Sequence, residues 1–554
     1  MRLKNFLCYF KSICENKFAS FLVLLAAFFI MLSYKITPML YPIHDKWIFN
    51  PYFDTCEVFP LKFFDYLLWI FLFLFLSFTV KFLAEKIQFN TLYRTCKSKY
   101  YLLLTLSFFI AWLPYFLTFY PGTITWDDIL SMRDPWGYNH QPLLYGYFLK
   151  FIWDFEIFLG NDLLGFALFV ILKILFMAFT VSYILIFLYK RGISKILLIF
   201  FFILFAFLPI FPHYAIGIIK DNFFALFIVF MTLFLYEYSN DYTKIVRETK
   251  PFFTFIFLSL MIIWLRNNGI HIMFLTVVVL VILAKNMKVR FLMLAIIFIT
   301  AGTLPDIGRN VPFKETVGMP IQQIARTLNV GGEISEKNKE IFNNVMPLSM
   351  FKENYIAFSA DMIKWNPNFN SEYLNAHKKE FLVAWIETFP KNFCAYLTAQ
   401  AFVTYEFWSI SPWQIYRVNE IEPKFPFNTH INQTVYPHAI THDLLKDKHI
   451  ELNICDLKTS EKVILPENIS DKIAFFMIQN LFYLNGGICG IILLISMSIT
   501  LYKGKRNRII SVLPMLFLWG TLLLATPIFS SFRYVFFFAL LMPFIISLPF
   551  MTEE

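Results

Sequence analysis

Charge is scarce in this sequence. Charged residues make up only 16% of the chain, whereas 58% are hydrophobic, 20% are aromatic, and phenylalanine alone occurs 71 times. A soluble core does not require so much apolar surface, and long runs without a charged residue are typical of helices that cross a bilayer. The composition therefore excludes an ordinary soluble protein and predicts an all-α polytopic membrane protein.

Cysteine is also scarce, with seven residues in 554. No C-x-x-C pair and no zinc-type spacing occurs, which excludes the common cysteine-based metal and redox motifs. Cys394 and Cys455 both fall in a predicted outer region, where either a disulfide or two unpaired thiols would fit.

The net charge of +10 would suit a nucleic-acid-binding protein, but its distribution does not. The basic residues lie in short loops between apolar segments, as in membrane proteins whose orientation follows the positive-inside rule. No nucleic-acid partner is predicted.

Apolar runs predict about twelve transmembrane helices. The first follows a basic N-terminus like that of a signal peptide, but no small-residue cleavage site comes after it, so we expect an uncleaved span. The predicted spans cover approximately Phe18–Tyr34, Phe63–Leu83, Tyr100–Phe119, Leu163–Tyr189, Ile196–Phe211, Asn222–Tyr238, Phe252–Leu265, Gly269–Leu283, Phe291–Leu304, Phe475–Leu501, Ile509–Pro527 and Tyr534–Phe550.

Basic residues concentrate on one side of this arrangement. If the N-terminus is inside, the inside segments contain the basic clusters at 2–17, 81–99, 190–195, 244–250, 285–290 and 503–508. The outside loops and span ends contain only eight basic residues, Lys35, Lys46, Lys62, Arg133, Lys150, Lys220, Arg266 and Arg533. This bias predicts a multi-pass plasma-membrane protein with both termini in the cytoplasm.

The segment Pro142–Leu159 is apolar and aromatic but is interrupted by Lys150, Asp154 and Glu156. If it crossed the membrane, every later basic loop would face outward, so we predict a helix on the outer surface. The chain then divides into an N-terminal transmembrane domain (1–304) with a catalytic outer loop (120–160), an inserted mixed extracytoplasmic domain (305–471) and C-terminal transmembrane helices (472–554).

Two adjacent carboxylates, Asp127 and Asp128, follow the third predicted span. Pro121 and Gly122 end that helix and turn the chain. Carboxylates at the mouth of a membrane helix are costly unless water, a cation or a substrate meets them. We therefore predict that Asp127 or Asp128 acts as a general base or binds a divalent metal ion such as Mg²⁺ or Mn²⁺. An ordinary solvated loop is the alternative.

Most other unusual polar groups beside the spans fall on the same predicted outer side. They are His140, Gln141, Lys220, Asp221, Arg266, Asn267, Gln322, Gln323, Arg326, Arg533 and Tyr534. Each also has a purely structural explanation. Lys220 and Asp221 could form a simple ion pair, and Arg266 could extend to the lipid headgroups. Gln322 and Arg326 could lie on the surface of the outer domain. Together, acids and cations on one face suit a substrate that carries phosphate, so we predict substrate binding for this set. Lys173, in the middle of a span, receives no role.

The acidic pair and the residues after it carry a family resemblance. Trp126-Asp127-Asp128 is similar to the Asp-Glu pair of protein O-mannosyltransferases, and His140-Gln141-Pro142 is similar to a following His-Pro box, with Gln141 in place of a proline. The chain thus resembles the GT-C class of glycosyltransferases, which use polyprenyl-phosphate-linked sugars at the outer membrane face.

A second likeness covers most of the chain and is to an uncharacterised family of bacterial multi-span proteins. It rests on Pro121-Gly122, Lys220-Asp221, Arg266–Gly269, Gln322–Arg326 and Arg533-Tyr534. This likeness implies a fold and an orientation rather than a reaction.

The GT-C resemblance implies transfer of a sugar from a polyprenyl-phosphate carrier to an envelope glycan, lipid or protein. Asp127 or Asp128 would be the base or metal ligand, and Lys220, Arg266 and Arg533 would meet the lipid phosphate. Two alternatives remain, a transporter or flippase of lipid-linked glycans, which should place polar residues in broken helices at mid-membrane, and a non-catalytic envelope-assembly protein that would tolerate loss of the aspartates.

Overall fold

The structure is a computed structural model. It describes residues 16–40, 56–87, 93–137, 141–159, 164–283, 287–303, 312–410, 434–435, 464–480, 485–526 and 532–552. Asp127 falls in this range with its backbone only, and His140, Cys455 and most of 411–463 lie outside it.

Helices form almost all of the N-terminal half. In chain order they are α2 (Lys17–Leu40), α4 (Phe63–Lys86), α5 (Lys99–Thr118), α6 (Trp126–Arg133), α7 (Leu143–Phe158), α8 (Leu164–Lys190), α9 (Lys195–Phe207), α10 (Ile210–Ile216), α11 (Lys220–Glu237), α12 (Lys244–Arg247), α13 (Thr249–Leu265), α14 (Gly269–Leu283) and α15 (Lys288–Thr303).

The second half is also helical. The inserted region contains α16 (Phe313–Thr316), α17 (Gly318–Asn329), α18 (Glu336–Val345), α19 (Leu348–Glu353), α20 (Asp361–Lys364), α21 (Ser371–Ala376), α22 (Lys378–Thr388), η3 (Pro390–Asn392), α23 (Phe393–Val403) and α24 (Tyr405–Trp408). The C-terminal part contains α26 (Glu467–Asn480), α27 (Gly486–Tyr502), η5 (Arg506–Val512), α28 (Leu513–Ala525), η6 (Phe532–Val535) and α29 (Phe536–Ser547).

Five helical segments in the described part of the chain are long and apolar enough to cross a membrane: α2, α4, α5, α8 and η5 with α28. The pair α9 and α10 passes the same test but bends by 53° at its break, which would make a sixth span or a re-entrant loop. A mostly helical chain with several such helices supports the predicted all-α membrane protein.

Two predicted spans differ from the structure. The segment predicted as one helix over Ile196–Phe211 is broken between α9 and α10, where Pro209 interrupts the run. The segment predicted over Phe475–Leu501 is divided between α26 and α27. The first of these segments is apolar on both sides of Pro209, so hydropathy alone does not reveal where its backbone bends.

Tryptophan side chains link neighbouring helices of the bundle through hydrogen bonds. The buried indole of Trp112 on α5 donates to the Phe205 carbonyl at 3.1 Å, and that of Trp519 on α28 donates to the Phe407 carbonyl at 2.7 Å. Trp264 on α13 donates to Ala301 on α15 at 3.0 Å. Each indole thus buries its apolar body while its N–H keeps a partner, as a low-dielectric interior requires.

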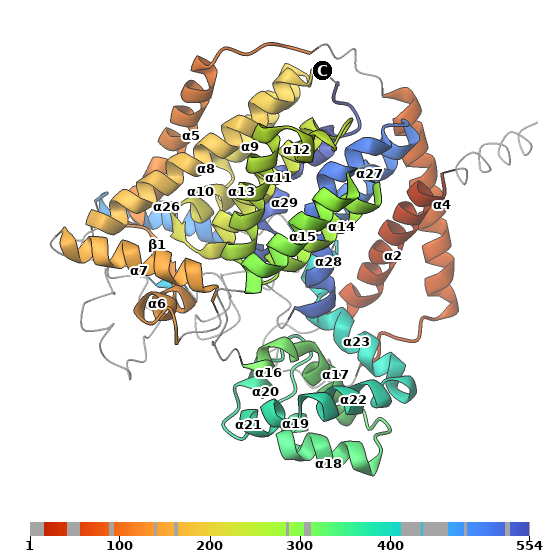
Figure 1. Cartoon of the computed structure of the whole chain (residues 1–554). Coiled ribbons are helices and arrows are strands. Elements are labelled where there is room, and N and C mark those ends of the chain that lie inside the picture. Colours follow the sequence, from red (N-terminus) through yellow and green to blue (C-terminus); the bar gives the residue numbers. More distant parts are fainter. Residues whose placement is uncertain are drawn as a thin grey trace, which may run out of the picture.

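The inserted region projects from one end of the bundle, and α6 and α7 lie toward that same end, whereas the C-terminus lies at the opposite end (Figure 1). Its described part, 312–410, is helical apart from an isolated bridge between Ile356 and Ser359, so no mixed domain is seen there. Gln400 on α23 donates to the Leu523 carbonyl of α28 at 2.5 Å and so joins this region to the bundle.

A small sheet lies at the same end as α6. β1 (Thr123–Thr125) pairs in parallel with β2 (Gly217–Ile218), with Thr123 opposite Gly217, and antiparallel with β3 (Thr434–Val435). The strands β1 and β2 lead directly into α6 and α11. Parallel pairing therefore places the first turns of these two helices side by side.

α7 covers the start of α8 (Figure 1). The Lys150 ammonium and the Asp154 carboxylate form an exposed ion pair at 2.9 Å, as a surface helix would allow. Glu156, in contrast, is fully buried, and its carboxylate accepts the Phe166 backbone N–H of α8 at 3.0 Å. A carboxylate there satisfies an N–H that has no helical partner and complements the helix dipole.

We expect Glu156→Ala to lower the free energy of unfolding by about 1–2 kcal/mol, because it removes this cap. Asp154→Ala on the same helix should cost less than about 1 kcal/mol, since an exposed ion pair contributes little. Equilibrium unfolding of the detergent-solubilised chain measures both. Equal losses for the two variants would show that Glu156 does not stabilise the α7–α8 contact.

Candidate functional site

The strand pair β1–β2 brings two charged motifs together. β1 runs into Trp126 and Asp128 at the first turn of α6, and β2 runs into Lys220 and Asp221 at the first turn of α11. The sequence places these motifs almost a hundred residues apart, but they follow paired parallel strands at the same edge. Such strand ends are where α/β proteins commonly bind ligands.

Gly122 makes this arrangement possible. It follows α5 with a φ of 127°, which side-chain-bearing residues rarely adopt. A Cβ at this position would also lie 2.7 Å from Val170 of α8 and 2.8 Å from the Ile216 carbonyl before β2. The predicted chain reversal is therefore confirmed, and it requires glycine for both conformation and space.

Asp128 is 1% exposed, so the alternative of an ordinary solvated loop is wrong for this residue. Burial, followed by the negative charges of Asp128 and Asp221, raises the pKa of Tyr145 on α7 well above its usual range. The Tyr145 hydroxyl is thus buried within the influence of both carboxylates. Sequence reasoning missed Tyr145, because an aromatic residue in an apolar helix carries no distinctive signal.

Asp221 is the centre of a second charged cluster. Its buried carboxylate lies 3.1 Å from the Arg266 guanidinium at the end of α13 and 3.7 Å from Arg533 in η6. The Tyr534 ring lies under Arg266 at 4.4 Å, and its hydroxyl accepts from Arg533 at 3.0 Å. The structure therefore brings together four of the predicted residues, and Arg266 turns inward rather than out to headgroups.

Lys220 does not form the simple ion pair with Asp221 that was the alternative. Its ammonium donates to the side-chain carbonyl of Gln141, just before α7. This contact joins the first turn of α11 to the residue just before α7, the helix that carries Tyr145. Gln141 is buried, so it contributes to the interior of the site.

Two further side chains support the site from within the bundle. Lys173 on α8 donates to the carbonyls of Tyr214 and Ala215 at 2.6 and 3.2 Å, and also to that of Gly217. Asn222 on α11 donates to the carbonyls of Tyr214 and Gly217 at 2.6 and 3.1 Å. For the Lys173 contacts, the only signal in the sequence was a lysine in the middle of a predicted span.

The Gln-Gln-x-x-Arg motif lies in the inserted region, on α17. Gln322 donates to the Ile356 carbonyl, and Arg326 donates to the Cys56 carbonyl. The Gln323 carbonyl accepts from the Trp385 indole at 2.9 Å, and its amide donates to Gln400 at 3.3 Å. These side chains are buried and engaged within the inserted region and with its neighbours, and the contacts do not join the Asp128 or Asp221 cluster.

Asn267 lies exposed in the tight turn between α13 and α14. Its neighbour Asn268 donates to the Thr521 hydroxyl of α28 at 3.2 Å. The predicted His140 and the Asp127 side chain fall outside the described residues.

The described residues do not form a metal site. No three of their His, Cys, Asp or Glu side chains gather in a way that could hold an ion. Asp221 instead faces two guanidinium groups. These fixed cations disfavour a divalent ion at the Asp221 carboxylate.

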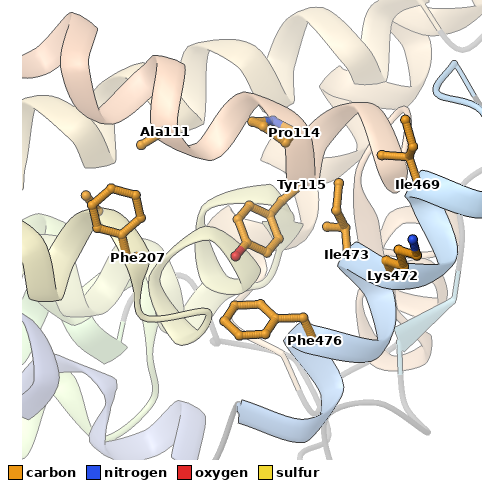
Figure 2. Close-up of a pocket in the computed structure, with 9 residues that line it drawn as sticks. Ala111, Pro114, Tyr115, Phe207, Ile469, Lys472, Ile473 and Phe476 are labelled. Carbon is orange, nitrogen blue, oxygen red and sulfur yellow. The ribbon is translucent and has the colours of Figure 1, made fainter.

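An apolar cavity of about 350 Å³ lies between α5, α9 and α26. Figure 2 shows Pro114 and Tyr115 of α5 on one side and Ile473 and Phe476 of α26 on the other. Lys472 is the charged residue of this lining. The cavity has the shape and chemistry to accept part of a hydrocarbon chain.

The thiol of Cys394 is free, while its possible partner Cys455 lies outside the described residues. No curated protein and no solved structure matches the chain. Residues 139–554, which include Gln141, Lys220, Arg266 and Arg533, match a family model described as a family of unknown function, DUF6020. Since this match covers more than half of the sequence, the chain belongs to the DUF6020 family.

Proposed function

We propose that the chain is an integral membrane glycosyltransferase. It would move a sugar from a polyprenyl-phosphate carrier to a glycan, lipid or protein acceptor of the cell envelope. The observation that carries this proposal is the pairing of β1 with β2, which sets the buried Asp128 beside the motif that contains Lys220 and Asp221. A carboxylate and several fixed cations then meet at one end of the helical bundle.

The cations suit the phosphate of the carrier. Arg266 and Arg533 both pair with Asp221, so two guanidinium groups lie together in this cluster. Guanidinium groups bind phosphate oxygens through charge-assisted hydrogen bonds, and Asp221 and Tyr534 hold these two in place beforehand. Such preorganisation lowers the cost of binding an anion.

Asp128 suits the role of general base. In the proposed reaction, the acceptor hydroxyl oxygen bonds to C1 of the sugar while the bond from C1 to the phosphate oxygen breaks. The acceptor proton passes to the Asp128 carboxylate, and the polyprenyl phosphate leaves with the bonding electrons. Arg266 and Arg533 would stabilise the charge that develops on this phosphate.

The apolar cavity supports a lipid carrier. Its α26 wall packs against α5 and α10, and α10 leads directly into β2 and the cluster at Asp221. An isoprenoid segment could lie against the apolar lining of this cavity (Figure 2). Its phosphate would then extend along α10 toward the cations. This provides a route by which a membrane-embedded substrate could approach the site.

A divalent metal ion stays a proposal that would require Asp127 together with Asp128. No step above depends on it. Among the described residues, no three His, Cys, Asp or Glu side chains gather to hold such an ion.

We also propose the finer membrane arrangement: a plasma-membrane location, twelve spans, a surface position for α7, and cytoplasmic termini. The five long helical segments and the α9–α10 pair would supply six of the twelve spans. The shorter apolar helices α13, α14, α27 and η6 with α29 would supply four more, and α11 and α15 the last two. The positive-inside distribution supports this orientation.

Labelling of introduced cysteines tests the orientation, in a chain whose seven native cysteines are replaced. In intact cells, a membrane-impermeant thiol reagent should label Glu336→Cys, whose native side chain is 88% exposed, but neither Lys97→Cys nor Asn507→Cys. All three should react after the cells are opened. Labelling of Lys97→Cys and Asn507→Cys in intact cells would contradict the proposed orientation.

A transporter is the second candidate, and one observation favours it: the bend between α9 and α10, since transporters often bind their cargo at broken helices. In such proteins, freed carbonyls coordinate a transported ion. Here the Phe205 carbonyl beside the bend accepts from the Trp112 indole. The carbonyls of Tyr214, Ala215 and Gly217, at the other end of α10, accept from Lys173, a fixed part of the chain. These carbonyls therefore serve the packing of the bundle rather than a cargo site.

The glycan profile of cells with and without this chain tests the proposed function. Loss of the chain should remove one sugar from an envelope glycan, lipid or protein and cause its polyprenyl-phosphate donor to accumulate. Restoring the chain should reverse both changes. An unchanged profile, with no accumulated donor, would contradict the proposal.

A further inference from the structure

Lys173 is a buried charge that the proposed reaction does not use. It lies within α8 and is 2% exposed. Its ammonium has three hydrogen atoms and contacts three backbone carbonyls, those of Tyr214, Ala215 and Gly217. The donor capacity of this side chain is thus matched by the backbone at the α10–β2 junction.

This junction needs donors from outside its own helix. α10 ends at Ile216, and the chain continues as the extended strand β2, so the last carbonyls of α10 lack helical partners. Inside a bundle, an unpaired carbonyl is costly. Lys173 from α8 and Asn222 from α11 together supply these donors, and both contact Tyr214 and Gly217.

The same junction determines where Asp128 lies. Gly217 is the first residue of β2 and pairs with Thr123 of β1, and β1 continues into the turn of α6 that contains Asp128. Lys173 is therefore connected to Asp128 through the strand pair.

We propose that Lys173 is a positioning residue that acts as a built-in hydrogen-bond donor. It holds the α10–β2 junction in its extended form, keeps β1 paired with β2, and so fixes Asp128 for catalysis. The catalytic part of this inference rests on the proposed glycosyltransferase function, whereas the effect on strand pairing does not.

Crosslinking measures the strand pairing without any assay of activity. In a chain without native cysteines, Thr123→Cys and Gly217→Cys occupy opposed positions on β1 and β2, and a Cβ at Gly217 lies 3.2 Å from the Thr123 hydroxyl. Oxidation of the purified full chain should join the two thiols and protect them from a maleimide–polyethylene glycol reagent after denaturation.

In this background, Lys173→Met should slow crosslinking by about tenfold, because three carbonyls lose their donor. Lys364→Met is the matched control. Lys364 is another buried lysine, but it pairs with Glu315 and Asp361 in the inserted region. The Lys364→Met substitution should leave crosslinking of the β1–β2 pair unchanged. An unchanged rate with Lys173→Met, or an equal decrease with both variants, would overturn the proposal.

Rescue distinguishes positioning from general packing. Lys173→Met should lower the rate of sugar transfer, and the disulfide formed by Thr123→Cys with Gly217→Cys should restore most of it. Crosslinked chain that stays inactive, while the same disulfide leaves the chain with Lys173 active, would contradict the positioning role. Absence of transfer in every variant would contradict the proposed function, and the crosslinking rates would still decide the structural claim.

Discussion

Asp221→Asn is expected to lower the free energy of unfolding by about 3 kcal/mol, because it removes the counter-ion of two largely buried guanidinium groups. Arg266 and Arg533 come from different helices, and each has a side chain only 12% exposed. Without the Asp221 charge they would repel one another, and the contact between α11, α13 and η6 would weaken. Equilibrium unfolding of the solubilised chain measures the loss.

Asp241→Asn is the control for this prediction. The Asp241 carboxylate lies 3.5 Å from Arg247, but both side chains are substantially exposed. This change should cost less than about 1 kcal/mol, since exposed ion pairs are screened by water. If both substitutions had the same small effect, Asp221 would not be the centre of the cationic cluster.

Asp128→Asn is expected to reduce sugar transfer by about 10²–10⁴-fold, the usual effect of losing a positioned general base. Asparagine preserves the size of the side chain but cannot accept the acceptor proton. Because Asp128 is buried, the variant should also be checked for folding, by the crosslinking of positions 123 and 217 described above. Initial rates in membranes supplied with a polyprenyl-phosphate sugar measure the effect.

Asp134→Asn provides a matched control in the same segment. Asp134 is exposed, and its carboxylate accepts the Gly137 backbone N–H at 2.8 Å, as in a local turn. This variant should keep full activity. If Asp128→Asn were correctly folded and retained full transfer, Asp128 would not be the base, and Asp127→Asn would identify or exclude its neighbour.

The apolar helices could be predicted because their signal is local. Each predicted span overlaps a helix, since a long apolar run and its flanking charges are contained in one short stretch of sequence. The Pro121–Gly122 reversal and the tight turn after Arg266 were predicted on the same basis. The break between α9 and α10 was not predicted, because both sides of Pro209 are equally apolar.

The site could be predicted only in part, because its contacts are long-range. Charge and position indicated Asp221, Arg266 and Arg533 separately, but not that one carboxylate would lie between two arginines. Burial of Asp128 and the role of Tyr145 depend on how α7 packs over α6, which no local pattern reveals. Gln322 and Arg326 had the expected helical spacing, yet that spacing serves equally for contacts inside the inserted region.

Reconstitution of the purified chain in vesicles distinguishes sugar transfer from transport. The purified full chain would be placed in vesicles that contain a radiolabelled polyprenyl-phosphate sugar and supplied with envelope acceptors. The account predicts that the wild-type chain forms labelled acceptor and releases polyprenyl phosphate in equal amounts, whereas folded Asp128→Asn does neither at a comparable rate. Movement of the intact lipid-linked sugar between leaflets without any labelled acceptor would contradict the account and identify a transporter.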